Sequence, residues 1–119
     1  MNILKLTSPL SLAFICLYSR AQQKEFHPGQ LWPDNKGVNI NAHGGGMLYQ
    51  KGTYYWFGEL KMAGNVAMVG LHCSSSKDLY NWKDEGISLA VSQDSTRDIA
   101  KGCVLERPNV IYNKKQKNM

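Results

Sequence analysis

The stretch Asn39–Glu59, NINAHGGGMLYQKGTYYWFGE, decides the fold of this 119-residue chain. Two apolar runs rich in aromatic residues, MLY and YYWF, flank the four residues Gln50–Thr53, which include one glycine. This pattern predicts a β-hairpin. Because antiparallel pairing brings the two ends of a hairpin together, the polar residues Asn41 and His43 before the first strand are expected to lie close to Glu59 after the second.

The rest of the chain continues in short β segments. Val66–Ser74 and Trp82–Leu89 are predicted as a third and a fourth strand, with Ser75–Tyr80 as the turn between them. Val104–Tyr112 is predicted to begin a fifth strand, in which Pro108 favours an edge or a bulge. No amphipathic helical stretch of useful length is present. The fold class is therefore all-β, with the strand spacing of a propeller blade or a piece of a sandwich.

The first 21 residues predict an export signal. Lys5 precedes the apolar segment Leu10–Tyr18, which is too short to span a bilayer as a helix, and Ser19–Ala21 fits a cleavage site. A buried N-terminal strand or helix is the alternative, and lipid attachment at Cys16 is a second one. We expect a periplasmic or extracellular protein with no membrane span in its mature chain.

The mature chain would have 119 − 21 = 98 residues. Residues 22–38 are polar and irregular, and Trp32 is expected to anchor this lead-in by packing. Cys73 and Cys103 could pair in an exported protein, or could be small buried hydrophobes; the sequence leaves both open. The predicted fifth strand is followed by a turn at Asn113 with no returning strand, so we expect a truncated reading frame.

Composition and spacing exclude several function classes. The net charge of +5 is mild, and the basic cluster Lys114–Lys117 is typical of a solvated tail, so no nucleic-acid partner is expected. The three histidines are too scattered for a zinc site, and no metal or cofactor is expected. Gly44–Gly46 lacks the GxGxxG spacing of a phosphate-binding loop, so we expect these glycines to permit close backbone approach.

Four motifs in order carry a family likeness: HGGG at 43–46, GTYYWFGE at 52–59, SSKDLYNW at 75–82 and ERPNV at 106–110. Together they resemble the N-terminal part of glycoside hydrolase family 43, and are most similar to its exo-1,3-β-galactanase branch. The resemblance covers roughly Pro28 to Lys115. It implies a five-bladed β-propeller with its site at the central channel. Residues 39–119 would then form the first blade and the start of the second, truncated at the C-terminus.

The resemblance also implies roles for single residues. The family usually presents an aspartate as general base on the innermost strand of the first blade. Here Asn41–Gly44 contains no carboxylate, and the galactanase branch is also unusual at this position. Glu59 matches a ligand of sugar hydroxyls, while Glu106 and Arg107 match substrate contacts on the second blade. The general acid lies in later blades, so no catalytic residue is expected within this chain.

Each site residue also has a simpler interpretation. His43 is a candidate donor to a sugar hydroxyl, or a structural histidine that fixes a loop. Glu59 is a sugar ligand or an exposed charge at a strand end. Glu106 is a sugar ligand or the partner of Arg107 in a local ion pair of small energy. The substrate-binding set predicted from the sequence is thus His43, Glu59, Glu106 and Arg107.

The function expected from these residues is that of an exported glycoside hydrolase, represented here by a fragment that is inactive alone. Its substrates would be plant-type polysaccharides or oligosaccharides, cleaved as by β-galactosidases, β-xylosidases or arabinosidases. The alternative is a non-catalytic exported carbohydrate-binding β module. Because an isolated blade exposes faces that normally pack on neighbours, the chain alone is expected to be poorly folded or to self-associate.

Overall fold

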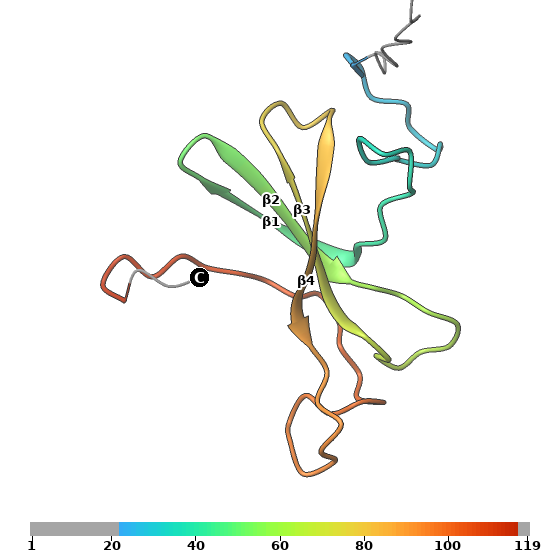
Figure 1. Ribbon diagram of the computed structural model, residues 1–119, viewed down its shortest axis with the longest axis vertical. Helices are drawn as coiled ribbons and strands as arrows, with labels where there is room; N and C mark the ends of the chain where they lie inside the picture. Colours follow the sequence, from blue (N-terminus) through green and yellow to red (C-terminus); the bar gives the residue numbers. More distant parts are fainter. Residues whose placement is uncertain (1–21, 117–119) are drawn as a thin grey trace, which may run out of the picture.

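A single antiparallel β-sheet dominates the computed structural model, which describes residues 22–116 (Figure 1). The expected export signal lies outside these residues. The sheet has the order β1-β2-β3-β4, so each strand pairs with its neighbour in sequence. Its members are β1 (His43–Gln50), β2 (Thr53–Glu59), β3 (Gly70–Ser76) and β4 (Trp82–Ala90). The all-β prediction is therefore confirmed. Among the described residues, no helix has the length and hydrophobicity to cross a membrane.

The predicted hairpin forms between β1 and β2. Its turn consists of Lys51 and Gly52, with φ angles of 48° and 75°. Two-residue hairpin turns favour positive φ at both positions, because that backbone twist matches the twist of the strands. The register pairs Gln50 with Thr53 at the turn and His43 with Glu59 at the open end. The two predicted ends therefore meet.

The third strand starts later than predicted, at Gly70 instead of Val66. The apolar residues before it bond to the segment after β4. The Ala67 amide donates to the Cys103 carbonyl over 2.8 Å, and the Gly102 amide donates to the Ala67 carbonyl over 2.8 Å. Ala67 is fully buried by this contact between two loops. The fourth predicted strand is confirmed as β4, one residue longer than expected.

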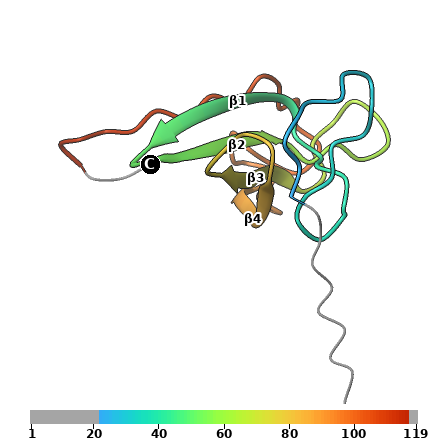
Figure 2. The ribbon, with the colours of Figure 1, turned by 90° about the horizontal axis from the view of Figure 1, so that it is seen from above.

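The prediction of a fifth strand over Val104–Tyr112 is wrong. This segment has no strand, and Arg107 has a φ of 47°, which interrupts an extended backbone just before Pro108. None of the strands within residues 22–116 pairs with it. It passes beside the start of β1, where a Cβ added at Gly46 would lie 2.8 Å from the Pro108 carbonyl oxygen (Figure 2).

Three tryptophans join the irregular lead-in to one face of the sheet. Trp82 is only 1% exposed, and its ring centroid lies 5.4 Å from that of Trp56 and 6.4 Å from that of Trp32. The Trp82 indole also donates to the Leu79 carbonyl over 2.9 Å. Trp32 therefore anchors the lead-in as predicted, and Trp56 contacts both Trp32 and Trp82.

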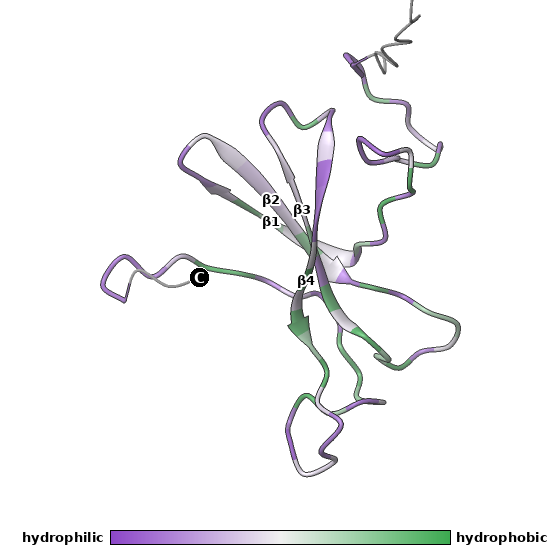
Figure 3. Cartoon of the chain, in the orientation of Figure 1, coloured by the Kyte–Doolittle hydropathy of each residue, from purple (hydrophilic) through white to green (hydrophobic). Residues whose placement is uncertain are grey.

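The buried core of this part of the chain is small. The buried apolar residues are Phe57, Ala67, Leu71, Cys73, Trp82 and Val91. Within residues 22–116, thirteen large apolar side chains are exposed, among them Met47, Met68, Val104 and Ile111. Figure 3 shows that β4 changes from hydrophilic near its start to hydrophobic at its end. Cys73 and Cys103 are both free thiols, and burial raises the pKa of Cys73 to about 11.

The two outer strands of the sheet differ in regularity. Pairing between β3 and β4 is interrupted twice, between Leu71 and His72 and between Cys73 and Ser74. Gly86, in the middle of β4, has a φ of 85°. In contrast, β1 keeps an unbroken register with β2 from Gly46 to Gln50.

Candidate functional site

The centre of the candidate site is the carboxylate of Glu59, the last residue of β2. It is 1% exposed, so the alternative of an exposed charge at a strand end is wrong. His43, opposite Glu59 in the register, places its Nδ1 atom 3.9 Å from Glu59 Oε2 and is itself 57% exposed. The structure thus brings two of the four predicted site residues together.

Lys61 supplies a cation to this carboxylate. Its Nζ atom lies 3.3 Å from Glu59 Oε2, and its side chain is 25% exposed. The other oxygen, Glu59 Oε1, is buried and has no hydrogen-bond partner among residues 22–116. Because a buried charge is costly unless it is paired, Lys61 is an essential part of this arrangement.

Asn41 fixes the backbone of Lys61. Its Oδ1 atom accepts from the Lys61 amide over 2.9 Å, and its Nδ2 group donates to the Lys61 carbonyl over 2.8 Å. One side-chain amide therefore continues the hairpin pairing beyond its last residues. Sequence reasoning placed Asn41 at this end but did not identify Lys61 as a site residue. The available signal was the Glu-x-Lys spacing, which puts two side chains on one side of an extended chain.

Arg107 lies beside the start of β1. A Cβ added at Gly44 would be 3.3 Å from the Arg107 amide nitrogen, and one added at Gly45 would be 2.6 Å from the Phe57 carbonyl oxygen. The prediction that these glycines permit close backbone approach is confirmed. The structure therefore places Arg107 next to the residue that follows His43.

Glu106 is exposed, and within the described chain it makes no ion pair with Arg107 and none with His43. The alternative of a local Glu106–Arg107 pair is therefore not found. No hydrogen bond or ion pair in residues 22–116 joins Glu106 to Glu59. The fourth predicted residue stays outside the contacts that connect Glu59, His43 and Lys61.

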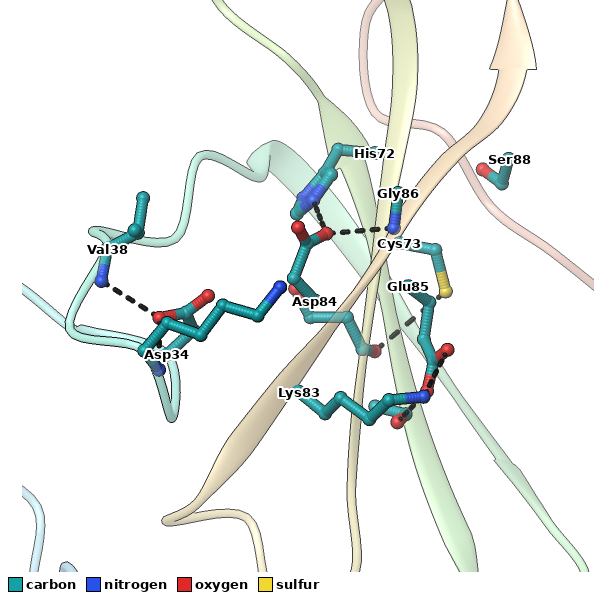
Figure 4. Close-up of polar contacts among 12 residues, drawn as sticks. Asp34, Val38, His72, Cys73, Lys83, Asp84, Glu85, Gly86 and Ser88 are labelled. Atoms are coloured by element: carbon teal, nitrogen blue, oxygen red, sulfur yellow. Dashed lines mark hydrogen bonds and ion pairs between the residues drawn. The ribbon is translucent and has the colours of Figure 1, made fainter. Parts of the chain in front are cut away.

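A second polar cluster lies on the opposite face of the sheet, with Trp56 and Trp82. His72 Nε2 donates to Asp84 Oδ1 over 2.7 Å, and the Gly86 amide donates to the same oxygen over 2.8 Å (Figure 4). The bond from His72 is the largest influence that holds the pKa of Asp84 below its ordinary value. This cluster supports the irregular part of β4. Within residues 22–116, no group of three or more His, Cys, Asp or Glu side chains could hold a metal ion.

The solved structures that resemble this chain include β-1,3-galactosidases and exo-β-1,3-galactanases. A β-1,3-galactosidase of glycoside hydrolase family 43, solved with galactodeoxynojirimycin, is 58% identical over 74% of this chain and 26% of its own, with a TM-score of 0.70. An exo-β-1,3-galactanase from Clostridium thermocellum is 40% identical over 74% of this chain and 18% of its own, with a TM-score of 0.63.

An exo-β-1,3-galactanase from Phanerochaete chrysosporium, solved with galactose, is 37% identical over 74% of this chain and 20% of its own, with a TM-score of 0.67. A scan against protein-family models and a search of curated proteins each found no match. The chain spans between 18% and 28% of the length of the first solved structures that it matches. Their identity of 31–58% and their shared fold show that the chain belongs to glycoside hydrolase family 43.

Proposed function

We propose that this chain is part of an exported glycoside hydrolase that cleaves β-1,3-linked galactosides. The observation that carries the proposal is the 58% identity to a β-1,3-galactosidase at a TM-score of 0.70. In this proposal the four-stranded sheet is one blade of a propeller, and the end of the sheet with His43 and Glu59 faces the saccharide. The exo-β-1,3-galactanases among the matched structures favour a galactose-containing substrate over xylose- or arabinose-containing ones.

The proposed contacts to the sugar start at Glu59. Its Oε1 atom has no partner in the described residues, and a carboxylate oxygen accepts strong hydrogen bonds from hydroxyl groups. Because Oε1 is enclosed, a ligand reaches it when a covering side chain moves. His43 is the side chain proposed to move, since it is 57% exposed and its Nδ1 atom lies 3.9 Å from Oε2, the other oxygen of the same carboxylate. Arg107 and Glu106, both exposed beside this end, add further polar contacts.

In this proposal the chain does not supply the proton that glycoside cleavage requires. A general acid must carry a proton and release it to the leaving oxygen. Glu59 is in an ion pair with Lys61, which suits a hydrogen-bond acceptor instead of a proton donor. We therefore propose that the general acid belongs to a part of the enzyme outside these 119 residues and that the chain alone hydrolyses nothing.

A chimera tests this function. The matched segment of the β-1,3-galactosidase that is 58% identical is replaced by residues 22–116 of this chain, so that the general acid comes from the host enzyme. The chimera is expected to hydrolyse β-1,3-galactobiose, and the isolated chain is expected to release no product from the same substrate. The measurement is galactose release at equal protein concentrations.

Two results would contradict the proposal. One is a chimera that unfolds cooperatively, and is therefore folded, but does not release galactose. The other is turnover of β-1,3-galactobiose or an aryl galactoside by the isolated chain, because that would place the acid within these residues. The unmodified host galactosidase is the positive control for both assays.

A further inference from the structure

We infer that Lys61, held in place by Asn41, is a positioning residue for Glu59. In this arrangement Lys61 occupies Glu59 Oε2, and this leaves Oε1 as the oxygen that receives a sugar hydroxyl. The inference rests on the proposed function, in which Glu59 contacts the saccharide. It adds Lys61, which the family motifs quoted above do not include.

Burial makes Lys61 the dominant partner of the carboxylate. Glu59 is 1% exposed, so its charge is taken almost completely out of water. Lys61 Nζ is closer to Oε2 than His43 Nδ1 is, at 3.3 Å against 3.9 Å. Lys61 is also the more buried of the two, at 25% against 57% exposed, and ion pairs weaken with exposure to solvent. Removal of Lys61 would leave a buried carboxylate with one distant, exposed partner.

The position of Lys61 depends on Asn41. Lys61 lies two residues beyond Glu59, where β2 has already ended. Two residues apart in an extended chain, the side chains of Glu59 and Lys61 lie on the same side. Outside the strand, the backbone of Lys61 is held by the two hydrogen bonds to the Asn41 side chain, one on each side of the residue. Asn41 thus holds the backbone at Lys61, one residue beyond Leu60, whose amide donates to the Gly70 carbonyl at the start of β3 over 3.0 Å.

The consequence is that the two oxygens of Glu59 differ. Oε2 has Lys61 and His43 within 4 Å, whereas Oε1 has no partner in the described chain. A carboxylate held at one oxygen cannot rotate without breaking the ion pair. In this orientation Glu59 presents one hydrogen-bond acceptor, Oε1. An acceptor in a fixed position can select one hydroxyl among several on a sugar ring.

The test uses the chimera and β-1,3-galactobiose. Lys61→Met is expected to raise KM by about 10- to 100-fold, the range that follows from losing a hydrogen bond to a charged group. The value of kcat is expected to change less, because the contact binds the sugar before and during reaction. Lys61→Arg keeps the positive charge, and its KM is expected to stay close to that of the unsubstituted chimera. Lys51→Met is the matched control, since Lys51 is exposed in the turn at the other end of the hairpin.

A double-mutant cycle separates positioning from general stability. In a Glu59→Gln background, Lys61→Met is expected to add less than threefold to KM, because the group that Lys61 positions is already altered. Thermal unfolding of every variant is recorded alongside. If Lys61→Met does not fold, the cycle is repeated with Asn41→Ala, which keeps the charge, frees the backbone and is expected to raise KM in the same direction.

The inference is overturned if Lys61→Met behaves like Lys51→Met, or if the effects of Lys61→Met and Glu59→Gln simply multiply. If the chimera is active and either of these results is found, only the role of Lys61 is refuted. A folded chimera that never releases galactose would remove the proposed function as well, so the two failures are distinguishable.

Discussion

Trp82→Ala is expected to destabilise the chimera by about 3–5 kcal/mol, the usual cost of truncating a buried aromatic residue. Trp82 is 1% exposed and contacts both Trp56 on the sheet and Trp32 on the lead-in. Its indole also donates to the Leu79 carbonyl in the turn before β4. One substitution therefore removes the side chain that joins sheet, turn and lead-in, in a region with a small core.

The measurement is urea unfolding of the chimera and its variants. Trp82→Phe keeps most of the packing and loses the indole hydrogen bond, so it is expected to cost about 1 kcal/mol for that bond, plus a smaller packing loss. Tyr49→Ala is the control, because Tyr49 is 60% exposed at the far end of β1. A Trp82→Ala variant as stable as Tyr49→Ala would show that the tryptophan cluster does not hold the lead-in.

The isolated chain, residues 22–119, is expected to be poorly folded or to self-associate. Among residues 22–116, six apolar residues are buried, whereas thirteen large apolar side chains are exposed. If one sheet face lost a partner of about 800 Å² that is half apolar, the missing burial is worth about 10 kcal/mol. That is comparable to the whole net stability of a domain, about 5–15 kcal/mol.

Light scattering after size-exclusion chromatography and a thermal scan measure this outcome. The chimera is the control, because the host enzyme covers the same faces. We expect a mass above that of the monomer, or a monomer without a cooperative transition. A monomeric mass together with a sharp thermal transition would refute the prediction.

The hairpin could be predicted because local sequence determines it. Gly52 permits the two-residue turn, and the length of the turn sets the register of the hairpin from Gln50 and Thr53 back to Gly46 and Phe57. An irregularity between His43 and Gly46 then places His43 opposite Glu59. The start of β3 could not be predicted, because Val66–Val69 is as apolar as a strand. The backbone partners of Ala67, Gly102 and Cys103, lie more than thirty residues away, and the Val69 carbonyl accepts from the distant Val91 amide. The prediction of a fifth strand was wrong for a related reason. A strand needs a second strand to pair with, and an apolar sequence pattern alone does not provide one.

The sequence identified the residues of the site better than it indicated their burial and their ion pairs. Motif spacing identified Glu59 and His43, and their contact is present. The burial of Glu59 could not be predicted, since it depends on tertiary packing. Lys61 was missed for the same reason, because its ion pair is important only when the Glu59 carboxylate is buried. The side-chain hydrogen bonds of Asn41 to a backbone twenty residues away leave no periodic signal in the sequence.

The contrast between the two outer strands limits how copies of the sheet could join through their backbones. The interruptions and the left-handed glycine in β4 make that border a poor template for strand addition. The border formed by Gly46–Gln50 is regular, and within the described residues no strand pairs with its outer side. With one usable border per molecule, two copies would join border to border around a twofold axis and then have none left, so backbone pairing would end at a dimer and would not propagate into a fibre.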